Sequence, residues 1–139
     1  MTDHAARLVR HLHPQPGAVF DAWTDPSQLT RWYGPNPQMP LEFHGSVSPG
    51  GDYNLTMGGE YTARGTYSAV EGPNLLEFTW ARDHEPLAET VVRVQIDRTA
   101  DGTTRLTLTH SGFDSADDAA GHQEGWDLAL NRLVVLLGL

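Results

Sequence analysis

The segment at residues 117–139 constrains the fold of this 139-residue chain most strongly. Its large apolar residues recur at four- and three-residue spacing, which places them on one face of an α-helix. They are Trp126, Leu130, Leu133 and Leu137. Because polar side chains occupy most other positions, the pattern predicts a long amphipathic helix with one side in a core. A helix of this length needs an equally long apolar partner, which the rest of the chain must supply.

About seven segments with strand-like alternation of apolar and polar residues precede this helix. They cover residues 7–13, 41–47, 53–57, 61–70, 76–80, 92–96 and 106–110. Two short helices, at residues 17–23 and 26–32, follow the first strand, and Asp25 is the expected N-cap of the second. One long helix can cover only one face of such a sheet. We therefore predict an α+β fold, in which a curved antiparallel sheet of six to seven strands wraps around the C-terminal helix.

Composition limits the function classes open to this chain, which we take as a single domain over residues 1–139. The 18 acidic and 9 basic residues give a formal net charge of -9, which repels a phosphate backbone, so we expect no nucleic-acid partner. The absence of cysteine excludes disulfides, thiolate metal sites and thiol catalysis. No signal-peptide core or full-length membrane span is evident, so we expect a cytoplasmic protein.

Seven short stretches, spread over nearly the whole chain, occur in the same order as in one known protein superfamily. They are VFDAWTDP (19–26), RWYGP (31–35), PGG (49–51), GTY (65–67), FTW (78–80), GTTRLTLTHSGF (102–113) and GHQEGW (121–126). Together they resemble the START-like (SRPBCC) superfamily, and within it the group named for the C-terminal domain of Aha1, the Hsp90 ATPase activator. The resemblance implies the helix-grip (START/Bet v 1-like) fold and a link to the stress response. It also implies a cavity that different members use for lipid transport, hormone sensing, aromatic cyclisation or chaperone adaptation.

The candidate binding site consists of residues predicted to face the concave side of the sheet, with their neighbours on the helices. Apolar walls carrying a few hydroxyls are typical of small-molecule sites. The candidate ligand-binding residues are Trp32, Tyr53, Met57, Tyr61, Tyr67, Phe78, Trp80, His110, Phe113, Trp126 and Leu130. We predict that an apolar or aromatic molecule, lipid-like or polyketide-like, binds between helix and sheet without a cofactor, with Trp126 at the closed end. Taken singly, each aromatic residue is better explained by core packing.

His110 is the candidate catalytic residue, because it shares the inward parity of Leu106 and Leu108 at the end of the last strand. A buried imidazole must find partners for both nitrogens. His110 is therefore either a structural histidine bonded to backbone or a ligand contact or proton donor tuned near neutral pH. The second alternative predicts a cavity enzyme of cyclase or hydrolase type that uses His110 and a tyrosine.

Other features favour no further chemistry. His11 and His13 lie on the same side of a predicted strand but lack additional ligands at a known spacing, so we expect no metal site. The chain contains no nucleophile elbow, phosphate loop or dinucleotide fingerprint. A second alternative function is a co-chaperone-like adaptor, with the proline-containing segment 33–40 as its contact and a protein partner or a homodimer as the assembly.

Overall fold

The computed structural model describes residues 4–33, 41–58, 61–82 and 89–138, with Tyr61 described by its backbone. Its elements are β1 (His4–Leu12), α1 (Pro16–Thr24), α2 (Pro26–Trp32), β2 (Leu41–Gly45), β3 (Asp52–Met57), β4 (Tyr61–Glu71), β5 (Leu75–Arg82), β6 (Thr90–Arg98), β7 (Thr104–Phe113) and α3 (Ala116–Leu137). The predicted seven strands, two short helices and long final helix are therefore confirmed. β1 begins three residues earlier than the alternation predicts, and β7 ends three residues later.

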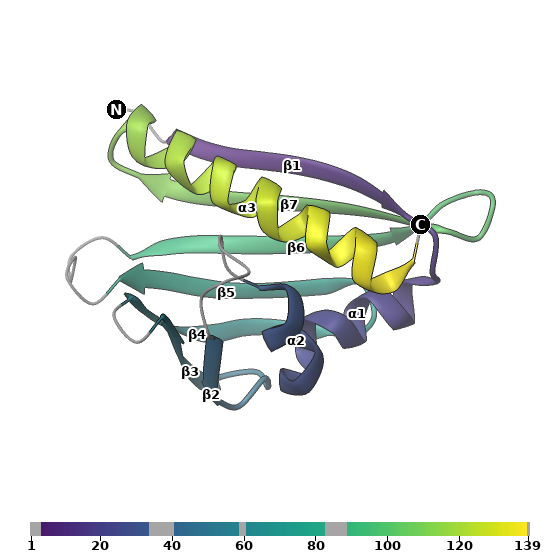
Figure 1. Ribbon diagram of the computed structural model, residues 1–139, viewed down its shortest axis with the longest axis horizontal. Coiled ribbons are helices and arrows are strands. Elements are labelled where there is room, and N and C mark those ends of the chain that lie inside the picture. The colour runs from purple at the N-terminus through teal and green to yellow at the C-terminus, as the bar shows by residue number, and fades with distance from the viewer. Residues whose placement is uncertain (1–3, 34–40, 59–60, 83–88, 139) are drawn as a thin grey trace.

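The seven strands form one antiparallel sheet in the order β1-β7-β6-β5-β4-β3-β2. Figure 1 shows α3 crossing one face of this curved sheet, with α1 and α2 at one end of the helix. α3 packs mainly on β1 and β7, while α2 contacts both α3 and β2. This is the helix-grip arrangement that the family resemblance implies, and it joins the first strand of the chain to its last helix.

α3 begins and ends at residues that suit helix termini. Ser115 is its N-cap and accepts a hydrogen bond from the backbone N–H of Asp118. The helix thus starts at residue 116, one residue earlier than predicted, and Asp118 lies in its first turn. Gly138 follows with φ of 89°, a left-handed value that favours glycine after a helix. Of the predicted apolar face, Trp126, Leu130 and Leu133 are buried, whereas Leu137 is half-buried.

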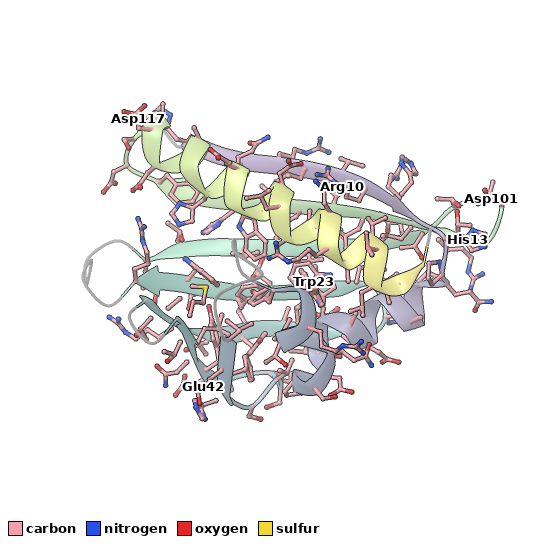
Figure 2. All side chains as sticks on the ribbon, in the orientation of Figure 1. Arg10, His13, Trp23, Glu42, Asp101 and Asp117 are labelled. Atoms are coloured by element: carbon pink, nitrogen blue, oxygen red, sulfur yellow. The ribbon has the colours of Figure 1, made fainter. Side chains whose placement is uncertain are left out.

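The two short helices carry aromatic residues into the interior. Asp25 caps α2 as predicted, because its carboxylate accepts a hydrogen bond from the backbone N–H of Ser27 at 3.0 Å. The indole N–H of Trp32 donates to the carbonyl oxygen of Ala22 at 2.9 Å, which ties α2 to α1. Figure 2 shows Trp23 in the interior, while Glu42 lies at the periphery of the molecule.

The core changes character across the sheet. β6 and β7 contribute branched aliphatic side chains, namely Val92, Val94, Ile96, Leu106 and Leu108, all fully buried. β3, β4 and β5 contribute aromatic residues as well, namely Tyr53, Tyr67 and Phe78, beside aliphatic ones such as Leu55 and Leu76. The close packing of β4 on β5 requires glycine at position 65, because a Cβ there would lie 2.0 Å from the carbonyl oxygen of Thr79. The hydroxyl of Tyr53, which pairs with Gly65 across the strands, donates to the same carbonyl at 2.6 Å.

Candidate functional site

Six of the predicted ligand-binding residues, all aromatic, belong to two separate groups of packed rings. The first, which we call the tyrosine group, lies on β2 to β5 and consists of Phe43, Tyr53, Tyr67 and Phe78, with ring centroids 5.3–6.1 Å apart for the pairs in contact. Burial raises the pKa of Tyr53 well above its usual range, and burial also raises that of Tyr67. Both hydroxyls therefore stay protonated at neutral pH, so the group supplies neutral polar atoms rather than a base.

The second group, the tryptophan cluster, gathers all four tryptophans of the chain around one tyrosine. Its members are Trp23, Trp32, Tyr33, Trp80 and Trp126. Trp126 is 6% exposed, and its ring lies 5.5 Å from Tyr33, 5.9 Å from Trp80 and 6.0 Å from Trp23, between centroids. The cluster thus joins α1, α2, β5 and α3, elements that are distant in sequence. Met57 and Leu130 are buried on β3 and α3.

The polar atoms of the tryptophan cluster are unequally satisfied. Trp126 donates its indole N–H to Nδ1 of His110 at 3.0 Å, and Trp32 donates to backbone. The indole nitrogens of Trp23 and Trp80 are also buried, but neither has a hydrogen-bond partner among the described residues. Leaving a buried donor unsatisfied costs about 1–3 kcal/mol, and native structures contain few such atoms. The cluster therefore presents two donors inside an otherwise apolar environment.

His110 is fully buried, and its nitrogens are both engaged by side chains rather than by backbone. An indole N–H can only donate, so Nδ1 of His110 accepts from Trp126, and Nε2 carries the proton that it donates to Oγ1 of Thr90 at 2.6 Å. Thr90 in turn donates to the carbonyl oxygen of Trp80 at 2.9 Å. Burial lowers the pKa of His110 to about 2. This geometry supports a structural role in which a neutral His110 ties α3 to the sheet; a catalytic role stays a prediction.

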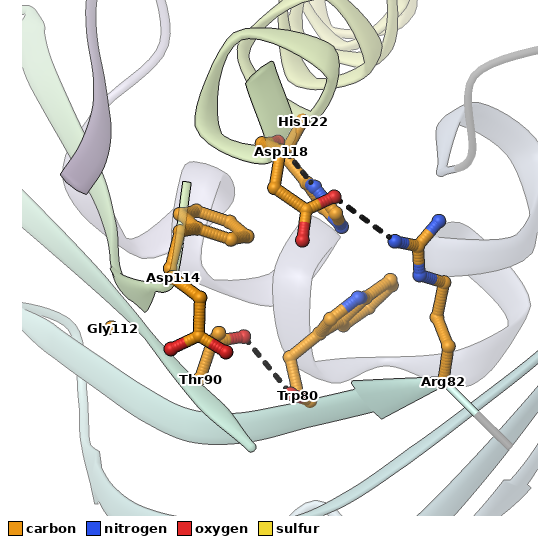
Figure 3. Close-up of a pocket in the computed structure, with 8 residues that line it drawn as sticks. Trp80, Arg82, Thr90, Gly112, Asp114, Asp118 and His122 are labelled. Atoms are coloured by element: carbon orange, nitrogen blue, oxygen red, sulfur yellow. Dashed lines mark hydrogen bonds and ion pairs between the residues drawn. The ribbon is translucent and has the colours of Figure 1, made fainter. Parts of the chain in front are cut away.

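A small cleft opens next to this hydrogen-bond chain, where the first turns of α3 face β5, β6 and the end of β7 (Figure 3). It offers about 10 Å³, room for about one water-sized group. Its lining residues are Trp80, Arg82, Thr90, Gly112, Phe113, Asp114, Asp118 and His122. Two predicted site residues, Trp80 and Phe113, thus line the cleft. His110 lies behind it, with its ring centroid 4.5 Å from that of Phe113.

The polar residues of the cleft include two that sequence reasoning missed, Arg82 and His122. Arg82 forms an ion pair with Asp118 at 3.3 Å. His122 donates its Nδ1–H to the carbonyl oxygen of Asp118 at 2.9 Å and packs on Phe113, with ring centroids 4.6 Å apart. The sequence contained a pattern that could have identified both residues. Arg82 follows Trp80 by two positions, the spacing that places two side chains on the same face of a strand. His122 likewise precedes Trp126 by one helical turn.

The remaining predictions concern metals, membranes and residues outside the described ranges. His11 and His13 are exposed, and the described residues contain no group of three or more His, Cys, Asp or Glu that could hold a metal ion. Within the same residues, no helix is long and apolar enough to cross a membrane. The Tyr61 side chain and residues 34–40 of the predicted adaptor segment lie outside the described part of the chain, whereas Tyr33 is buried.

Comparisons with known proteins agree with this fold. A family model described as Activator of Hsp90 ATPase homolog 1-like protein matches residues 14–138. A protein from Chromobacterium violaceum has a TM-score of 0.85 and 21% identity, over 96% of this chain and 97% of its own. DynU16, a protein in the dynemicin biosynthetic locus, has a TM-score of 0.84 and 21% identity, over 98% of this chain and 48% of its own. The AHSA1 protein of Silicibacter pomeroyi has a TM-score of 0.77 and 24% identity, over 96% of each chain. No curated protein matches the chain by sequence.

Proposed function

This chain belongs to the family of Activator of Hsp90 ATPase homolog 1-like proteins, and from that premise we propose that it binds a small apolar or aromatic molecule between α3 and the sheet. One observation carries the proposal. The buried indole N–H groups of Trp23 and Trp80 lack acceptors among the described residues, although both belong to a dense aromatic cluster. Aromatic rings of a ligand would pack on the tryptophans, and its oxygen atoms would accept from the indoles.

The origin of one structural neighbour supports a small-molecule role. DynU16 belongs to the dynemicin biosynthetic locus, so the same fold occurs in a protein from a locus that makes a small molecule. The cleft among the described residues has room for about one polar group, at about 10 Å³. A larger ligand therefore requires aromatic side chains of the tryptophan cluster to shift on binding, as a pocket that opens for its ligand does.

A ligand screen tests the proposal, because every tryptophan of the chain reports on the cluster. We expect at least one compound among naphthalene-type aromatics, fatty acids and isoprenoids to raise the melting temperature and change the intrinsic fluorescence. At a hundredfold excess over its dissociation constant, such a compound stabilises the fold by about 2.7 kcal/mol. Trp23→Phe, which keeps a ring but removes one donor, should weaken binding of oxygen-bearing compounds more than that of plain hydrocarbons. No response to any compound would remove the basis for this function.

Beyond ligand binding, we propose four further properties for this chain. They are a cytoplasmic location, a role in the stress response, an adaptor function through a protein partner or homodimer, and an enzymatic reaction that uses His110. The ligand-binding proposal needs none of them, and each requires its own experiment.

A further inference from the structure

The Nε2 atom of His122, at the cleft, has a fixed orientation but no hydrogen-bond partner among the described residues. The Nδ1–H of His122 donates to the carbonyl oxygen of Asp118, so in the neutral imidazole Nε2 is the acceptor. No described residue forms a hydrogen bond to Nε2. Figure 3 shows the His122 ring extending from α3 toward Trp80, beside the ion pair between Arg82 and Asp118. The backbone contact therefore fixes both the tautomer and the direction of a free acceptor.

A complementary donor lies in the wall of the same cleft. Trp80 lines it, and the buried indole N–H of Trp80 has no acceptor among the described residues. The cleft that Trp80 and His122 both line admits about one oxygen-sized group, at about 10 Å³. An acceptor, a donor and room for a single oxygen are together complementary to one chemical group, a hydroxyl, which can donate and accept at once.

We propose that this cleft binds one hydroxyl group of an aromatic ligand, with the O–H donating to Nε2 of His122 and the oxygen accepting from the indole N–H of Trp80. The inference rests on the proposed function and makes it more specific, since it names a phenol or aryl alcohol as the ligand class. The rings of the ligand would extend from the cleft into the tryptophan cluster, toward Trp126.

The charges around the cleft argue against the other polar groups of similar size. Two carboxylates, Asp114 and Asp118, line the cleft against one guanidinium, Arg82, which is paired with Asp118. A ligand carboxylate would therefore meet net negative charge. An ammonium group could donate to His122 but has no lone pair to accept from Trp80. A carbonyl oxygen has the opposite defect, because it cannot donate to His122.

Three matched compounds test the proposal: naphthalene, 1-methoxynaphthalene and 1-naphthol. We expect 1-naphthol to bind wild-type protein about tenfold more tightly than either of the others, the effect of about two net hydrogen bonds. His122→Phe keeps a ring on Phe113 but removes the acceptor, so this preference should disappear. His44→Phe, the same substitution at an exposed histidine on β2, should retain it.

A measurement on the wild type covers the case in which His122→Phe fails to fold. In protein labelled with ¹⁵N-tryptophan, 1-naphthol should move the indole N–H signal of Trp80 downfield. Trp32 is the internal reference, because its indole N–H is already bonded to Ala22. Equal affinity for all three compounds, or an unmoved Trp80 signal on naphthol binding, would overturn the hydroxyl site while leaving the proposed function intact. Absence of binding by all three, and by the wider ligand panel, would overturn both.

Discussion

Trp126 holds α3 to the sheet through ring packing and through one hydrogen bond, and the two contributions can be separated. Trp126→Ala removes both and should lower the free energy of unfolding by about 3–5 kcal/mol. Trp126→Phe keeps most of the packing but leaves Nδ1 of the buried His110 without a donor, which should cost about 1–3 kcal/mol. Urea unfolding monitored by circular dichroism measures both values.

The control for Trp126 lies two residues further along the same helix. Leu128 is 44% exposed, so Leu128→Ala should change the free energy of unfolding by less than about 0.5 kcal/mol. If Trp126→Ala were as mild as Leu128→Ala, Trp126 would not be part of the packed interior that its 6% exposure indicates.

His110 makes stability depend on pH in a definite direction. Burial lowers its pKa to about 2 in the folded protein, whereas a histidine in the unfolded chain titrates near 6.5. Between these values the unfolded chain binds a proton that the folded protein does not. The contribution of neutral His110 to the free energy of unfolding is therefore complete above about pH 6.5. It decreases by up to about 1.4 kcal/mol per pH unit as the pH falls below that value.

Comparison of two histidine variants isolates this dependence. Urea unfolding of the wild type at pH 8, 6 and 5 should show stability falling with acidity, and His110→Phe should show a smaller slope. His44→Phe, which alters an exposed residue, should keep the wild-type slope. Identical slopes for the wild type and His110→Phe would show that the folded protein protonates His110 as readily as the unfolded chain does.

At the scale of single elements, β4 and β5 approach each other closely because Gly65 has no side chain. Gly65→Ala would place a methyl group 2.0 Å from the carbonyl oxygen of Thr79, and backbone cannot move away without loss of strand pairing. We expect a loss of about 1–3 kcal/mol, the usual cost of overpacking. Gly121→Ala in α3 is the matched control, since nothing lies within 4 Å of its added methyl group. A helical alanine there should stabilise the protein by about 0.5–1 kcal/mol, and a similar gain for Gly65→Ala would contradict the close approach.

The same elements show what a sequence can and cannot predict. Alternation identified each strand, and the spacing of Trp126, Leu130 and Leu133 identified the face of α3, because both patterns are local consequences of backbone geometry. The cleft escaped prediction, since Arg82 and His122 are about forty residues apart and meet only where the first turns of α3 approach the end of β5. Strand alternation gives only the face of the sheet on which a side chain lies. It therefore could not show that the tyrosine group and the tryptophan cluster are two groups, because both lie on the same face of the curved sheet.

At the scale of the whole molecule, the first strand and the last helix are bonded to each other. Arg10 forms an ion pair with Asp127, and Gln123 accepts a hydrogen bond from the backbone N–H of Arg7. β1 also pairs with β7 along nearly its whole length. No described element can detach without exposing the common core, so we expect a single cooperative unfolding transition. Tryptophan fluorescence and far-UV circular dichroism should give coincident urea curves, and separated midpoints would reveal an independently unfolding part.

The position of α3 in the chain has a consequence for biosynthesis. The ribosome completes all seven strands before it makes the helix that covers their apolar face. Until α3 has emerged, the nascent sheet exposes the side chains that later surround Trp126, a state prone to association with other chains. A stop codon or ribosome stall before residue 116 would therefore leave a fragment whose sheet has an uncovered apolar face, and we expect such a fragment to aggregate.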